Sequence, residues 1–236
     1  MLIKNPKMFN VGALLAVSFI GVLLMIFSPL FQGKNGLEFA DESFNKLAKG
    51  SSYFIPKVSQ EVEKFTGKPL SASITLDSTE DAAATEKIFA QAGAKITRKD
   101  ATLTVESDIA VLLQSALKDA DAMYSNNGKA VSDRYGMDEK QAIKQWWTAL
   151  GKIEKQLKKE KNIKTAKIIS EVNKKGIEPG YNFYKIDANK VIDHAGMLSG
   201  LLVFYVFYTM WWGYAIFYLF DGIGLTMKKA KVRKEA

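Results

Sequence analysis

Few side chains in this sequence have types and spacing that suggest catalysis. The chain contains one histidine, His194, and no cysteine, which excludes disulfides, thiolate metal sites and covalently attached c-type haem. His194 stands at the start of a hydrophobic run, where an imidazole can relay protons or supply one axial ligand to a haem shared with another subunit. An interfacial structural role is the competing interpretation, and we favour it. We expect no cofactor held by this chain alone, and His194 is its only candidate for cofactor binding.

Acidic side chains supply two further candidates. Asp77, Glu80 and Asp81 are spaced closely enough to suggest a divalent-cation site. Acids in the first turn of a helix are also what the helix dipole favours, so we expect capping and no metal. Asp119 and Asp121 fall on different faces of their helix and make a poor general acid–base pair. With no Ser-His-Asp order, phosphate loop or zinc spacing present, we expect that the protein is not an enzyme.

Aromatic and basic residues near the middle of the chain suggest binding. Trp146 and Trp147 could line a groove, but their spacing with Ile143 and Leu150 indicates core or subunit-interface positions. Residues 139–175 hold 11 Lys or Arg against 4 Asp or Glu. This lysine row could contact anionic lipid or polymer, and a solvated outer helix face is the plainer interpretation. We expect no nucleic-acid partner.

Two charge-free stretches frame these candidates. The first runs from residue 8 to 33 and the second from residue 195 to 220. Each exceeds the roughly 20 apolar residues that cross about 30 Å of hydrocarbon. The first is longer than the hydrophobic region of a usual signal peptide, and no small-x-small cleavage motif follows it. We therefore expect two transmembrane helices, at residues 8–31 and 195–220.

The second stretch is unusually aromatic. Its segment LLVFYVFYTMWWGYAIFYLF, residues 201–220, carries ten aromatic side chains. Interfacial belts account for Trp and Tyr at the ends of a span but not along its length. A hydroxyl without a partner in hydrocarbon costs roughly 1–3 kcal/mol, so neighbouring helices are expected to supply partners. Gly196 and Gly200 form a small-xxx-small pattern that permits close helix approach. The predicted partner-binding residues are Gly196, Gly200, Tyr205, Tyr208, Thr209, Trp211, Trp212, Trp146 and Trp147.

Basic residues that flank the two spans predict their orientation. Lys4 and Lys7 precede the first span, and five Lys or Arg residues follow the second. The positive-inside rule then places both termini in the cytoplasm of a bacterial cell, with the middle domain periplasmic and the basic tail against the headgroups of the inner membrane. An exported domain without cysteine agrees with this location.

The middle of the chain predicts an α+β domain. Residues 70–76 alternate apolar and polar side chains, as a half-buried strand does, and two short strands and two amphipathic helices follow. With a last strand near residues 129–132, the order is βαββαβ, the ferredoxin-like arrangement. A helical hairpin follows. The predicted divisions are a cytoplasmic N-terminus (1–7), transmembrane helix (8–31), extracytoplasmic helices (32–69), ferredoxin-like core (70–133), helical hairpin and return segment (137–193), transmembrane helix (195–220) and basic cytoplasmic tail (221–236).

Three functions are compatible with these features. The leading hypothesis is a non-catalytic accessory or scaffolding subunit of a multi-subunit inner-membrane complex, such as an energy-transducing or electron-transferring one, whose partners are other integral membrane subunits and membrane lipids. The alternative comes from topology: two spans around an α/β outer domain with both ends inside is similar to the polysaccharide co-polymerases, which implies a homo-oligomeric regulator of envelope polymer synthesis. That family has a proline- and glycine-rich second span, whereas residues 195–220 contain no proline. A membrane-tethered hydrolase is the third.

Overall fold

The computed structural model describes residues 3–225 and divides into two units. We call residues 1–44 and 190–236 the helical unit, and residues 45–189 the α+β domain. The chain is mixed α+β and mostly helical, with one small antiparallel sheet. Residues 226–236, most of the predicted basic tail, lie outside the described part of the chain.

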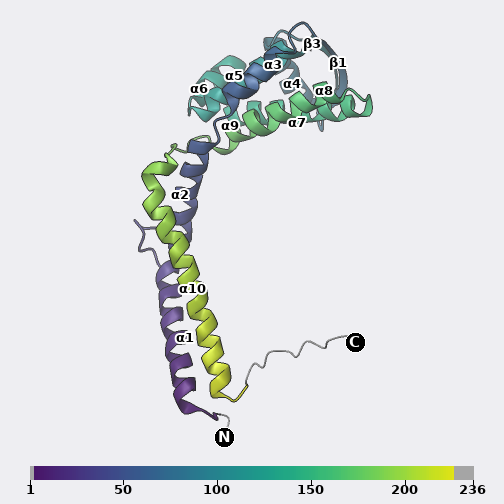
Figure 1. The fold of residues 1–236 in the computed structure, drawn as a ribbon. Coiled ribbons are helices and arrows are strands. Elements are labelled where there is room, and N and C mark those ends of the chain that lie inside the picture. The colour runs from purple at the N-terminus through teal and green to yellow at the C-terminus, as the bar shows by residue number, and fades with distance from the viewer. Residues whose placement is uncertain (1–2, 226–236) are drawn as a thin grey trace, which may run out of the picture. The chain divides into compact units, whose positions relative to one another are not determined.

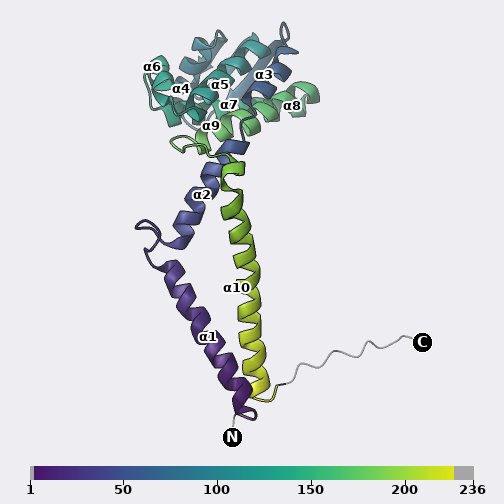
Figure 2. The same cartoon turned by 60° about the vertical axis from the view of Figure 1, so that its left-hand side comes forward.

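The helical unit contains two long apolar helices. Asn5 caps α1 (Pro6–Phe27), and Pro6 stands in its first turn, where a missing N–H costs nothing. The short 3₁₀ helix η2 (Val191–His194) leads into α10 (Ala195–Gly222). Both helices are long and apolar enough to cross a membrane, and their bounds lie close to the predicted spans 8–31 and 195–220. They run side by side where the start of α1 meets the end of α10 (Figure 2).

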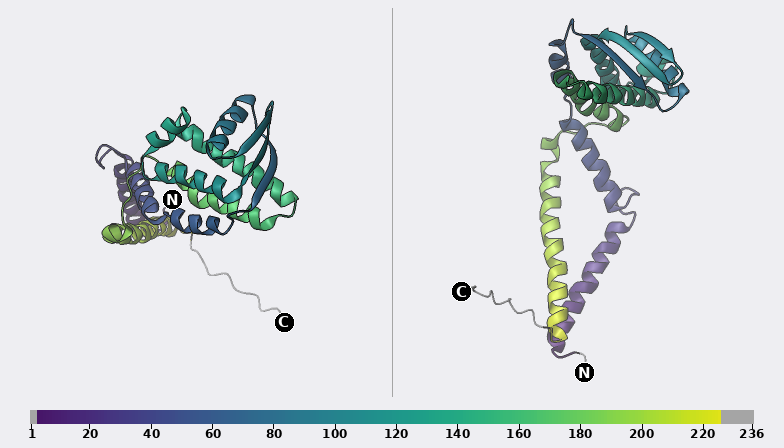
Figure 3. Two further views of the ribbon diagram at one scale, coloured as in Figure 1. Left: turned by 90° about the horizontal axis from the view of Figure 1, so that it is seen from above. Right: turned by 90° about the vertical axis from the view of Figure 1, so that its right-hand side faces the viewer.

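The sheet of the α+β domain has three strands in the order β1-β3-β2. They are β1 (Pro69–Thr75), β2 (Lys95–Lys99) and β3 (Thr102–Asp108), and β3 pairs antiparallel with both neighbours. Burial alternates along β1, with Leu70, Ala72 and Ile74 inside, as a strand with one covered face requires. Helices lie against that one face (Figure 3).

The predicted fourth strand of the ferredoxin-like sheet is wrong. Residues around 129–132 belong to helix α6 (Gly128–Tyr135). Val131 and Tyr135 are both buried four residues apart, which is helical spacing, and Gly136 ends the helix in the left-handed conformation. The edge of β1 where a fourth strand would pair is approached by α7, whose Gln156 Oε1 accepts a hydrogen bond from the Ser73 N–H at 2.9 Å.

The remaining helices, apart from the first and the last of them, contribute side chains to one contiguous core against the sheet (Figure 1). They are α2 (Gly36–Ser51), which runs from the helical unit into the domain, α3 (Ile55–Glu63), α4 (Thr79–Gln91), α5 (Ile109–Tyr124), α7 (Glu139–Lys159), α8 (Ile163–Val172), the π-helix η1 (Asn173–Ile177) and α9 (Glu178–Asn182). The predicted return segment after the hairpin begins as helix, because the chain continues from α8 into η1 and α9. Pro179 is accommodated in the first turn of α9.

A buried lysine joins the segments by which the chain enters and leaves the domain. Lys49, at the end of α2, is 4% exposed. Its ammonium donates to the carbonyl oxygens of Phe183 (3.1 Å) and Ile186 (2.5 Å) and to Asn126 Oδ1 (3.1 Å). Burial lowers the pKa of Lys49, and the charge of Asp187 acts against that shift. Nothing in the sequence pattern of α2 marks this lysine as buried.

Candidate functional site

The candidate site is the aromatic helix α10, and part of it packs on the chain's own first helix. Gly12 of α1 is buried against α10, where a Cβ would lie 2.6 Å from the Leu219 nitrogen. Gly222 makes the reciprocal approach to Phe9, and its carbonyl accepts the Lys4 and Asn5 N–H groups at 2.9 Å each. The two helices are therefore in backbone contact at small residues, as tightly packed apolar helices require.

Three of the predicted partner-binding side chains contact α1. Phe19 stacks with Tyr208 at a centroid distance of 4.3 Å and lies 4.7 Å from Trp212 and 6.3 Å from Trp211. The Trp211 indole N–H donates to the Leu15 carbonyl at 3.1 Å. Such ring pairs add about 0.5–1.5 kcal/mol each beyond the area they bury. These aromatics therefore have a partner within the chain, which the sequence alone did not identify.

Other aromatics of α10 point away from α1. Tyr205 is 63% exposed and Tyr214 is 51% exposed. Among residues 3–225, the hydroxyls of Tyr205, Tyr208, Tyr214 and Tyr218 have no hydrogen-bond partner, whereas the Thr209 hydroxyl donates to its own helix at Tyr205 and Val206. Tyr205 lies about 15 Å along the helix from Ala195 at 1.5 Å per residue, well inside a hydrocarbon layer if α10 spans one.

The remaining predicted residues at the start of α10 have few contacts. A Cβ at Gly196 or Gly200 would meet nothing within 4 Å, so this small-xxx-small pattern packs against no described part of the chain. His194 Nδ1 lies 3.3 Å from the Lys190 carbonyl. No group of three or more metal-ligating side chains is found among the described residues.

An apolar hollow of about 540 Å³ lies beside this end of α10. It is enclosed by the end of α1, the start of α2 and the side chains of Met197, Leu201 and Phe204. Its lining is almost entirely apolar. The exposed tyrosines lie on surfaces that α1 leaves free, and the hollow lies between α10, the end of α1 and the start of α2.

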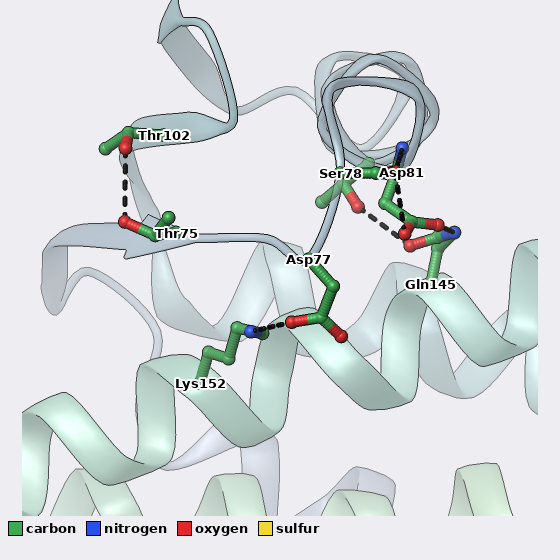
Figure 4. A network of polar contacts seen from close by, with 8 residues as sticks. Thr75, Asp77, Ser78, Asp81, Thr102, Gln145 and Lys152 are labelled. Carbon is green, nitrogen blue, oxygen red and sulfur yellow. Dashed lines mark hydrogen bonds and ion pairs between the residues drawn. The ribbon is translucent and has the colours of Figure 1, made fainter.

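The acidic candidates in the α+β domain have structural partners. Ser78 caps α4 by accepting from the Asp81 N–H at 3.0 Å, and Gln145 donates to Asp81 Oδ1 at 2.5 Å. Lys152 donates to Asp77 at 2.7 Å (Figure 4), and this hydrogen bond and charge lower the pKa of Asp77. Glu80 stands in the first turn of α4. Asp81 therefore lies in the capping network of α4, and Asp77 pairs with Lys152, a partner that the sequence did not predict.

The two neighbouring tryptophans differ completely in environment. Trp146 is fully buried, its ring lies 4.9 Å from that of Phe89, and its indole N–H donates to Asp119 Oδ2 at 2.9 Å. Of the two positions that its spacing indicated, core and subunit interface, it occupies the core. Trp147 is 48% exposed, and its indole N–H donates to Glu178 Oε1 at 2.9 Å. Trp147 does not belong to the buried stripe of α7 with which the sequence grouped it.

Asp119 is a buried polar centre that sequence reasoning missed. Besides Trp146, it accepts from the Tyr135 hydroxyl at 2.5 Å and pairs with Arg134. Burial raises the pKa of Asp119, while its three partners act in the opposite direction. The available signal was spacing, because Asp119 stands three residues after Ala116 and four before Met123 on the apolar stripe of α5.

Comparison of the chain with family models, with curated proteins and with solved structures finds no match.

Proposed function

We propose that this protein is a non-catalytic accessory or scaffolding subunit of a multi-subunit inner-membrane complex, which it joins through α10. The observation that carries the proposal is the set of tyrosine hydroxyls without partners along an apolar helix. Lipid offers such hydroxyls no acceptor, and neighbouring helices do. Tyr205 and Tyr214 are nine residues apart, about half a turn out of phase, so the partners would contact α10 on two sides.

The apolar hollow beside Met197, Leu201 and Phe204 supports the same proposal. A volume of about 540 Å³ lined by apolar side chains suits an inserted side-chain row of another helix. In this proposal the α+β domain lies in the periplasm and covers the outward side of the complex. Its βαββα order would be a reduced ferredoxin-like fold, with the α7–α8 pair as the appended hairpin. The partners are other integral membrane subunits and the lipids around them.

The test removes the hydroxyls and leaves the rings. Tyr205→Phe with Tyr214→Phe should weaken the complex by roughly ten- to a hundredfold, because interhelical hydrogen bonds are worth about 0.6–1.7 kcal/mol each. Native electrophoresis of gently solubilised membranes measures the loss. Thr209→Val is the matched control, since the Thr209 hydroxyl already bonds to its own helix and its removal should change nothing.

A double variant that migrates with the wild-type complex would refute docking through these hydroxyls. A band composed only of copies of this chain would instead support the alternative, a homo-oligomer similar in topology to the polysaccharide co-polymerases. Identifying the proteins in the shifted band by mass spectrometry separates the two functions.

A further inference from the structure

Two hollows adjoin Trp147 on the surface of the α+β domain. One, of about 350 Å³, lies toward Tyr181 and Asn182 of α9, and the other, of about 560 Å³, lies toward α8 and η1. Trp147 and Glu178 line both hollows, so the two adjoin, and together we call them the Trp147 groove. Four further residues that line the larger hollow matter for ligand binding: Gly151, Lys155, Asn173 and Lys174.

The groove exposes a fixed aromatic face. The Trp147 ring is half-exposed, and the hydrogen bond from its indole N–H to Glu178 at 2.9 Å holds the ring in place. Gly151 follows one helical turn later on the same face of α7, where a side chain would otherwise cover the ring. A glycine inside a helix costs about 1 kcal/mol relative to alanine. The open space above Gly151 is therefore maintained against local helix propensity.

One polar atom at the groove has unmet bonding capacity. Asn173 is 5% exposed, and within residues 3–225 its Oδ1 has no hydrogen-bond partner. Its Nδ2 makes a long bond of 3.5 Å to the Trp147 carbonyl and would lie 3.9 Å from a Cβ at Gly151. Asn173 begins the π-helix η1, a type of helix found frequently at functional sites. This oxygen is closed to solvent, so a donor from a ligand reaches it once the Asn173 amide turns toward the groove that it lines.

Positive charge at the groove is only partly neutralised. Lys152 pairs with Asp77 and Lys158 with Glu154. In the described residues, Lys155 and Lys174 have no acidic partner. Glu178, the third acid of the lining, bonds to the Trp147 indole, so the four lysines and three acids that line the larger hollow leave a net charge of +1. Two free ammonium groups next to an aromatic face select a ligand that carries a negative group.

We propose that the Trp147 groove binds an acidic saccharide, either a free oligosaccharide or part of an envelope polymer. A sugar ring has an apolar C–H face for Trp147, hydroxyl donors for Asn173 Oδ1, and a carboxylate, sulfate or phosphate for Lys155 and Lys174. A plain polyanion lacks the apolar face, and a neutral sugar leaves the ammonium groups unused. This proposal stands on the α+β domain alone and does not depend on docking through α10.

The test uses the full chain in nanodiscs and a panel of uronic-acid, sulfated and phosphorylated oligosaccharides, each with its neutral counterpart, plus inorganic tripolyphosphate. We expect an acidic saccharide to bind at least tenfold more tightly than its neutral counterpart, and Lys155→Gln with Lys174→Gln to remove that preference. Lys159→Gln, a neutral change at an exposed lysine of α7 outside the groove, should leave binding unchanged.

Gly151 supplies a matched pair of variants. Gly151→Ala adds a Cβ at ordinary contact distance from Asn173 and should keep binding. Gly151→Leu also favours the helix but fills the groove beside Trp147, and should lower affinity at least tenfold. Circular dichroism confirms that both variants fold. Binding of no acidic saccharide, equal binding by Gly151→Leu, or tripolyphosphate binding that Trp147→Ala leaves intact would each overturn the proposal.

Discussion

Asp119 shows how a single ionised group can organise the core of the α+β domain. Its carboxylate is fully buried and receives Tyr135, Trp146 and Arg134 from two different helices, α6 and α7. A buried charge costs several kcal/mol unless its partners satisfy it. The three partners therefore have to stay in place together, which orients α6 and α7 on α5.

We predict that Asp119→Ala lowers the free energy of unfolding of the domain by about 3–5 kcal/mol, because it leaves the buried Tyr135 hydroxyl and Trp146 indole N–H without an acceptor and the partly exposed Arg134 without its ion pair. Denaturant titration followed by the near-ultraviolet dichroism of Trp146 measures the change. Asp121→Ala is the matched control two residues along α5. Asp121 is only partly buried and accepts one bond, from the Tyr53 hydroxyl at 2.8 Å. Equal losses in the two variants would contradict a special role for Asp119.

At the scale of elements, the contact between α1 and α10 depends on the glycine at position 12. A Cβ at Gly12 would meet backbone atoms of Leu219, Tyr218 and Ala215 at 2.6–3.0 Å, whereas one at Gly21 of the same helix would meet nothing within 4 Å. Backbone atoms cannot move aside as side chains do. A side chain at position 12 should therefore disturb the pairing of the two helices, and one at position 21 should not.

We predict that Gly12→Ile separates the helices and Gly21→Ile does not. Overpacking costs typically about 1–3 kcal/mol, which should reduce the paired population by roughly five- to a hundredfold. The chain has no native cysteine, so Asn5→Cys with Ile223→Cys can be joined by a short bis-maleimide without background. Cross-linking yield in membranes reports the pairing. Undiminished yield in Gly12→Ile would show that the contact is not needed.

A helix or strand can be predicted from the sequence when its pattern depends only on neighbouring residues, and not when it depends on which other elements pack against it. The alternation in residues 70–76 and the cap at Ser78 are local, and both gave the observed strand and helix start. Helix α6 is short, and its two buried side chains, Val131 and Tyr135, fit a helix only once α5 and α7 are in place to bury them. The burial of Trp146 beside the exposed Trp147 likewise depends on which side of α7 meets the core.

At the scale of the whole molecule, the chain enters and leaves the α+β domain at one place. Lys49 binds the carbonyls of Phe183 and Ile186, and the Asn189 N–H donates to the Lys46 carbonyl at 3.0 Å. Gly50 approaches Asn189 too closely to permit a side chain. These bonds link segments about 135 residues apart, which sequence periodicity does not detect. They join the segments after α1 and before α10 at the domain itself.

The last prediction concerns the sides of the membrane on which the parts of the chain lie. The start of α1 and the end of α10 are hydrogen-bonded, with the Lys4 N–H on the Gly222 carbonyl, so if both helices span, Lys7 and the segment after Gly222 lie on one side. Lysines before α1 and after α10 favour the cytoplasm for that side. In intact spheroplasts, Lys129→Cys should react with an impermeant maleimide, and Lys7→Cys should react only after permeabilisation. The reverse pattern would invert the topology, and labelling of both residues in intact cells would rule out a membrane between them.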